Sequence, residues 1–171
     1  MDKNNILAVL EQLIIGQHFQ CEWGIEWNEQ QHYFELIFQF SLPNPNGISF
    51  KDAFGNSISY TTIPYETSIL FYDKDHLNVE HSNYVNSIPI SHNQGIAYGE
   101  LFAIVKYLKH LTSSVRVEWL DYLFDSPHDA YFEICWNDHD FAQIKKGLIE
   151  ANRYNSAPVF FPKNEAKGGL Y

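Results

Sequence analysis

The chain has 171 residues, of which 45% are apolar and 16% aromatic, and this composition excludes a disordered protein and predicts a globular one with an aromatic core. Its formal net charge of −10 argues against partners such as nucleic acids and anionic membranes, because the acidic bulk would repel phosphate groups. No stretch approaches the roughly 20 apolar residues of a membrane span, and the first residues lack the pattern of a signal peptide. We therefore expect a cytoplasmic protein.

The first predicted element is an amphipathic helix over residues 4–17. Its apolar residues recur at helical spacing on one stripe, namely Ile6, Leu10, Leu13 and Ile14. Asn4 or Asn5 can cap the start of this helix, since asparagine side chains accept hydrogen bonds from free backbone amides there.

Two segments in which every second residue is apolar follow, at residues 21–27 and 32–40. Side chains on a strand alternate between faces, so the pattern predicts an antiparallel hairpin over residues 20–42 with one strongly apolar face. With a turn at residues 28–31, Trp27 would lie opposite His32 at the margin of the sheet. Ile25 would then lie opposite Phe34, and Trp23 opposite Leu36.

The middle of the chain is less regular. Residues 43–64 begin with a loop rich in proline and asparagine and favour two short strands on either side of residues 54–56. Residues 68–72 are apolar on both faces, which predicts a central strand. Residues 76–95 are expected to be irregular, with a short extended piece at 88–90.

Helical periodicity returns in the C-terminal half. It predicts two helices, at 96–111 and 115–124, separated by a Thr-Ser-Ser run that we expect to break them. Alternation then predicts a strand at 130–136. Asn137 is expected to cap a last helix over 138–151, whose first turn holds acidic residues that the helix dipole favours. The inward residues of this helix are predicted to be Phe141, Ile144, Leu148 and Ile149.

Clustered strands followed by clustered helices predict an α+β fold, with a mainly antiparallel sheet of four to five strands and helices packed on one face. We expect a single α+β domain over residues 1–162 and a short C-terminal tail at 163–171. The residues predicted to be largely buried are Trp23, Phe34, Leu36, Phe38, Phe71, Phe132 and Ile134.

The sequence contains none of the common glycine-rich phosphate loops, paired-cysteine motifs or histidine-glutamate zinc motifs. It therefore yields no catalytic residue and no cofactor. The candidates for a metal site are Asp73, Asp75 and His76, which follow the central strand and begin like a calcium loop. The fifth position of that loop would be Leu77, which has no oxygen ligand, so a solvated loop is the competing interpretation.

Other polar residues have structural interpretations. Glu22, Glu26 and Glu35 gather on the second face of the hairpin, where carboxylates can do acid–base chemistry if buried and are ordinary polar residues if exposed. His92 is expected in a polar turn before a helix. Cys21 and Cys135 are expected to be free, buried thiols, since disulfides are rare in the cytosol.

Five segments of the chain together resemble a small family of low-GC Gram-positive bacteria, known only as domain of unknown function 3013. They are Trp-Gly-Ile-Glu-Trp-Asn (23–28), Ser-Ile-Leu-Phe-Tyr-Asp (68–73), Ser-Ile-Pro (87–89), Val-Lys-Tyr-Leu (105–108) and Phe-Glu-Ile-Cys-Trp (132–136). The similarity runs from about residue 5 to 162 and consists of core strands and helix seams. The resemblance implies a single cytosolic domain and transfers no activity or catalytic residue.

The leading functional hypothesis is a non-enzymatic protein-binding or regulatory module with an acidic surface, whose partner would be a basic protein. The alternative is a small-ligand or metal-dependent enzyme with a carboxylate site near the end of a central strand. A monomer is favoured over a homodimer, because the acidic charge and the glutamates of the hairpin's edge strand discourage pairing between two copies.

Overall fold

The computed structural model describes residues 4–45, 49–51, 54, 57–59, 61–76, 83–125 and 132–163. Within them the helices are α1 (Ile6–Gln17), α2 (Tyr98–Asp125) and α3 (Asp138–Glu150). The strands are β1 (Glu22–Asn28), β2 (Tyr33–Pro43), β3 (Ser49–Lys51), β4 (Ser57–Ser59), β5 (Thr62–Asp73), β6 (Ser87–Ile90), β7 (Ile96–Ala97) and β8 (Pro158–Val159).

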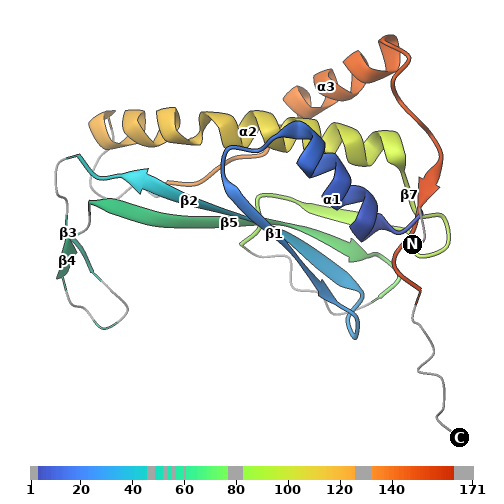
Figure 1. The fold of residues 1–171 in the computed structure, drawn as a ribbon, viewed down its shortest axis with the longest axis horizontal. Coiled ribbons are helices and arrows are strands. Elements are labelled where there is room, and N and C mark those ends of the chain that lie inside the picture. Colours follow the sequence, from blue (N-terminus) through green and yellow to red (C-terminus); the bar gives the residue numbers. More distant parts are fainter. Residues whose placement is uncertain are drawn as a thin grey trace, which may run out of the picture.

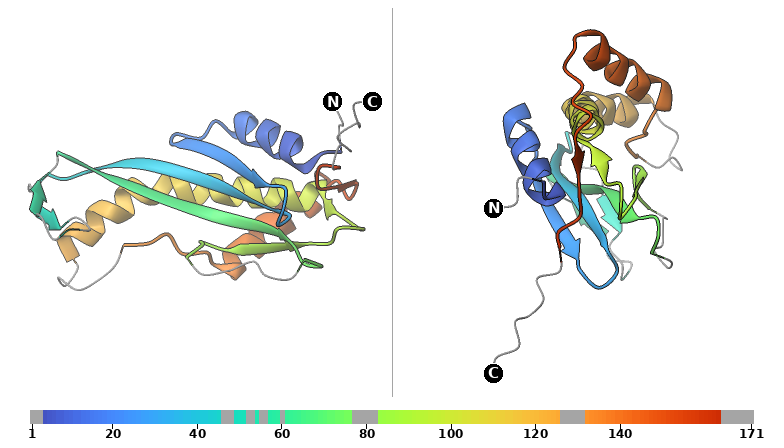
Figure 2. Two further views of the ribbon diagram at one scale, coloured as in Figure 1. Left: turned by 90° about the horizontal axis from the view of Figure 1, so that it is seen from below. Right: turned by 90° about the vertical axis from the view of Figure 1, so that its right-hand side faces the viewer.

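The main sheet has the strand order β1-β2-β5-β6 and is antiparallel except for the parallel pair β5 and β6. Helices α1 and α2 lie against one face of this sheet, and α3 lies against α2, farther from the sheet (Figures 1 and 2). We call the helix-covered face the inner face and the opposite one the outer face. The predicted α+β class is confirmed, with helices packed on one face of a mainly antiparallel sheet.

The hairpin of β1 and β2 is confirmed, but its predicted register is wrong by two residues. Trp27 lies opposite Phe34, Ile25 opposite Leu36, and Trp23 opposite Phe38. The connection is longer than expected because His32 still belongs to the turn, with a left-handed φ of 50°. A shift by two keeps every side chain on its predicted face, since the side-chain period of a strand is two.

The core lies between the inner face and the helices. Phe34, Leu36 and Phe71 are completely buried and Phe38 is 2% exposed, as predicted. Ile134 is also buried. Trp23 and Phe132 are only half-buried, which corrects their predicted burial. For Trp23 the reason is its place on β1, a strand at the edge of the sheet, where cover is available from one side only.

The predicted break between two helices at residues 112–114 is wrong, because α2 runs through it without interruption. The hydroxyl groups of Thr112 and Ser113 donate to the carbonyl oxygen of Lys109, and that of Ser114 donates to the carbonyl oxygen of Leu111. Because these hydroxyls find acceptors about one turn back in the same helix, they require no break in it. Val115 and Trp119 are buried on the continuing inner stripe, which favours one long helix.

No described helix is both long and apolar enough to cross a membrane.

The strand predicted at 130–136 is also wrong for its described part, because residues 132–137 pair with no strand. Two tyrosine side chains replace the missing ladder. The backbone amide of Ile134 donates to the hydroxyl of Tyr65 at 3.3 Å, and that of Asn137 donates to the hydroxyl of Tyr107 at 3.0 Å. The alternation of apolar and polar residues in this segment therefore reflects its packing against tyrosines of β5 and α2, and not membership of a sheet.

The predicted helix caps are confirmed, with Asn5 capping α1 and Asn137 capping α3. Ile149 is 54% exposed, which corrects its predicted inward position on α3. The two short strands are confirmed as β3 and β4, which pair with each other. The extended piece at 88–90 belongs to β6 and joins the main sheet, whereas Leu77 lies outside the described residues.

Candidate metal centre

Three side chains from distant parts of the chain meet at one end of the main sheet. Asp73 is the last residue of β5, His32 immediately precedes β2, and His92 follows β6 by two residues. Since β2 is antiparallel to β5 and β6 is parallel to it, the start of β2 and the ends of β5 and β6 lie at the same end. The backbone amide of Asp73 donates to the carbonyl oxygen of His32 at 3.0 Å, which fixes this arrangement.

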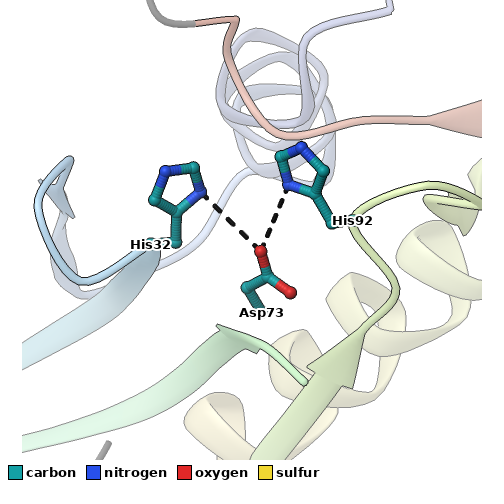
Figure 3. A group of neighbouring side chains, drawn as sticks. All are labelled: His32, Asp73 and His92. Carbon is teal, nitrogen blue, oxygen red and sulfur yellow. Dashed lines mark ion pairs between the residues drawn. The ribbon is translucent and has the colours of Figure 1, made fainter. Parts of the chain in front are cut away.

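The carboxylate of Asp73 lies between the two imidazole rings (Figure 3). Its Oδ2 is 3.2 Å from Nδ1 of His92 and 3.8 Å from Nδ1 of His32. One ligand atom from each residue lies within 4.8 Å of the other two. The donor atoms of a tetrahedral zinc site lie about 3.3 Å apart when the metal–nitrogen distance is about 2.0 Å. The group is therefore slightly wider than a metal-bound site and needs only small side-chain movements to close on an ion.

The chain holds the Asp73 carboxylate in place through its second oxygen. The backbone amide of Asp75 donates to Oδ1 of Asp73 at 2.9 Å. This bond leaves Oδ2 directed at the histidines, and the Asp73 side chain is 7% exposed. In the described part of the chain, the ion pairs of Asp73 are those with His32 and His92. A buried carboxylate is costly unless a positive charge or hydrogen bonds compensate it.

His32 is held from several sides. Its ring packs edge-on against Trp27 at a centroid distance of 5.8 Å and against Phe161 at 6.3 Å. The ring of His76 stacks on it at 5.7 Å. Its Nδ1 is buried and has no hydrogen-bond partner among the described residues. A buried nitrogen without a partner costs free energy, and coordination of a cation would remove that cost.

The three residues predicted from the sequence, Asp73, Asp75 and His76, all lie in this region but differ in burial. A hollow of about 320 Å³ is lined by His32, Asp73, Asp75, His76, His92 and Asn93. Asp73 is the buried one of the three candidates. Asp75 and His76 are exposed on its rim, and Asp75 accepts a bond from the backbone amide of His92 at 3.4 Å.

No pattern in the sequence indicates His32 and His92 as possible ligands. The hairpin pattern places His32 at the sheet margin, but its approach to Asp73 depends on the pairing of β2 with β5, which that pattern does not predict. His92 required the parallel pairing of β6 with β5, for which a four-residue strand gives little local signal.

The glutamates of the outer face do not form a comparable site. Glu26 lies directly opposite Glu35 in the ladder, and Glu22 and Glu26 are exposed. Glu35 accepts a hydrogen bond from the hydroxyl of Tyr84. Glu26 and Glu35 line a hollow of about 470 Å³, whereas Glu22 lines a different one, so the three carboxylates do not converge on one cavity.

The cysteines are free, as predicted, but their predicted burial is wrong, because Cys21 is half-buried and Cys135 exposed. Cys21 lines a hollow of about 830 Å³ between α2 and the far half of β2. Burial raises the pKa of the Cys21 thiol, although hydrogen bonds and Lys109 oppose the effect. This hollow therefore lacks an activated thiolate.

Fold and site together define an α+β protein with a histidine–aspartate cluster at the end of a central strand. The family described as "Protein of unknown function (DUF3013)" matches residues 1–163, and the chain belongs to this family. The resemblance seen in the sequence is thereby confirmed.

A solved structure shares the fold. It is described as a conserved protein of unknown function from Enterococcus faecalis, with a TM-score of 0.80 and 24% sequence identity over 95% of this chain and 98% of that chain. At this identity the likeness shows the fold alone. No curated protein matches the chain.

Proposed function

We propose that the protein binds a divalent transition-metal ion through His32, Asp73 and His92. The observation that supports this proposal is the buried Oδ2 of Asp73, which faces Nδ1 of both histidines. Two imidazoles and one carboxylate form a donor set found in zinc sites and in non-haem iron sites.

An accessible site of this kind would hold the ion with three protein ligands. The side chain of His92 is 51% exposed, and the hollow beside it opens to solvent. Catalytic zinc sites keep one coordination position for water or substrate, whereas structural sites are closed by four protein ligands. The exposure of His92 therefore favours an accessible ion, in agreement with the hypothesis of a metal-dependent activity.

Zinc titration of the purified protein tests the proposal. We expect saturable binding of one ion and a rise in melting temperature, because a ligand that binds only the folded state stabilises it by RT ln(1 + [L]/Kd). Asp73→Asn removes the bridging charge and should weaken binding at least about tenfold. Binding of cobalt(II) should add visible absorption bands that reveal its coordination geometry.

Asp121→Asn is the matched control, because Asp121 is exposed on α2 and does not line the hollow. It should keep the affinity of the wild type. Equal losses in the two variants, or no binding to the wild type at millimolar zinc, would show that Asp73 and His92 form only an ion pair.

We propose as a second function that the outer face of the sheet binds a basic protein partner. The strands β1, β2, β5 and β6 contain no lysine or arginine, and four glutamates share their outer face. They are Glu22, Glu26, Glu35 and Glu66. No described helix covers this face (Figure 2). A one-sign field of this kind attracts basic partners and repels nucleic acids and anionic membranes.

This second function is proposed for a monomer in the cytosol. Two copies that met through this face would bring like charges together. The free thiols Cys21 and Cys135 agree with a reducing compartment.

Fluorescence anisotropy with labelled deca-lysine tests whether the acidic face dominates binding. The variant with Glu22→Gln, Glu26→Gln and Glu66→Gln should bind several-fold more weakly than wild type at low salt, and the difference should shrink at high salt. The matched control changes three exposed acids of the helices, by Glu118→Gln, Asp121→Asn and Glu150→Gln. Equal weakening by both triple variants would mean that net charge, and not this face, attracts the peptide.

A further inference from the structure

The two edges of the main sheet differ in their capacity to accept another strand. β6 is a four-residue edge that contains Pro89, whose nitrogen carries no hydrogen to donate. β1 is a seven-residue edge without proline. Natural proteins use short edges and prolines to prevent unwanted pairing. By this criterion β6 is protected, whereas the backbone of β1 is accessible.

The hydrogen-bond pattern identifies which backbone groups of β1 face outward. The amide of Asn44 donates to the carbonyl of Thr61, and the amide of Asp73 donates to the carbonyl of His32. Even-numbered residues of β2 therefore bond to β5, and its odd-numbered residues bond to β1. With Gln39 opposite Glu22, the even-numbered residues of β1 bond to β2. The amides and carbonyls of Trp23, Ile25 and Trp27 thus point away from the sheet.

A groove runs along this same edge. It has a volume of about 390 Å³ between α1 and β1 and is lined by Asn5, Leu7, Ala8, Glu11, Trp23, Ile25 and Trp27. Trp23, Ile25 and Trp27 are the inner-face residues of β1 and are only half-buried. A strand added beside β1 would place every second side chain over this groove and the others beside the glutamates of the outer face.

We propose that the edge of β1 binds an extended peptide in which apolar and basic residues alternate, by adding it to the sheet as a fifth strand. Its backbone would bond to the outward groups of Trp23, Ile25 and Trp27, and its basic side chains would lie beside Glu22 and Glu26. A second copy of β1 would instead bring the glutamates of both copies onto one face of the joined sheet, where like charges repel. The inference deepens the second proposed function, from which it takes the basic character of the partner.

A synthetic peptide of alternating lysine and valine tests the proposal. We expect it to bind the full-length protein more tightly than deca-lysine at high salt, because contacts with the groove and backbone bonds survive screening. Two further peptides carry N-methyl groups, one on every valine amide and the other on every lysine amide. Strand addition uses only one of these two sets, so one methylated peptide should lose at least about tenfold in affinity and the other should not.

The peptide that fails reports the direction of the added strand. Loss with the methylated valines indicates antiparallel addition, and loss with the methylated lysines indicates parallel addition. Equal affinity of the two methylated peptides overturns strand addition. If the Glu22, Glu26 and Glu66 triple variant still binds the peptide more weakly in that case, the proposal that the acidic face binds basic partners is retained and only strand addition is lost. Light scattering that shows dimers persisting in high salt would overturn the choice of a peptide over a second copy.

Discussion

Replacing Phe38 by alanine is expected to lower the free energy of unfolding by about 3–5 kcal/mol. The side chain is 2% exposed in β2, between β1 and β5, and its ring stacks on that of Phe19 at a centroid distance of 5.4 Å. Its removal would leave a cavity under two helices that neighbouring side chains cannot fill without moving. Urea unfolding followed by circular dichroism measures the change.

Phe124→Ala is the matched control for this substitution. Phe124 lies near the end of α2 and is 73% exposed. Its truncation should change the free energy of unfolding by less than about 0.5 kcal/mol. A cost below about 1 kcal/mol for Phe38→Ala would contradict a continuous core between the sheet and the helices.

Ser113→Pro is expected to destabilise the protein by about 3 kcal/mol or more, because Ser113 lies inside the uninterrupted helix α2. Proline would remove the amide hydrogen that bonds to the carbonyl of Lys109, and its ring would clash with that carbonyl. The helix could not bend freely in response, since Val115 and Trp119 anchor its second half in the core. The melting temperature and the helical circular dichroism signal should both fall.

The same substitution distinguishes a continuous helix from two helices. If α2 were broken at residues 112–114, a proline there would occupy the first turn of a second helix, where it is tolerated. Ser113→Ala is the control, and its effect should stay within about 0.5 kcal/mol because the serine side chain is exposed. A stable Ser113→Pro variant would therefore contradict the helix as described.

Local patterns in the sequence predicted the elements whose stability depends on near neighbours. Alternation identified the inner face of β2, and Asn5 and Asn137 identified two helix starts. The errors arose where distant residues decide the outcome. Residues 132–137 alternate like a strand, but the hydroxyls of Tyr65 and Tyr107 supply their hydrogen bonds, and no local pattern encodes such partners.

In the candidate metal site, too, a local pattern indicated one residue, and long-range pairing brought in the other two. Asp73 was found because it follows an apolar strand in a run of polar residues. His32 and His92 became its neighbours only through the pairing of β2 and β6 with β5, which joins residues up to about sixty positions apart. Pairing of that range depends on the whole sheet, and the alternation of each strand does not reveal which strand lies beside it.

The link between the two ends of the described chain has a consequence for biosynthesis. Asn5 and Phe160 form a parallel bridge, with the amide of Ile6 bonded to the carbonyl of Phe160 at 2.9 Å and the amide of Phe160 bonded to the carbonyl of Asn4 at 2.8 Å. Helix α1 is synthesised long before residue 160, yet its start gains these bonds only after residue 160 has emerged. The β1–β2 hairpin can form much earlier, since its contacts are local. A nascent chain can therefore pair its hairpin while the start of α1 still lacks its bonds to Phe160.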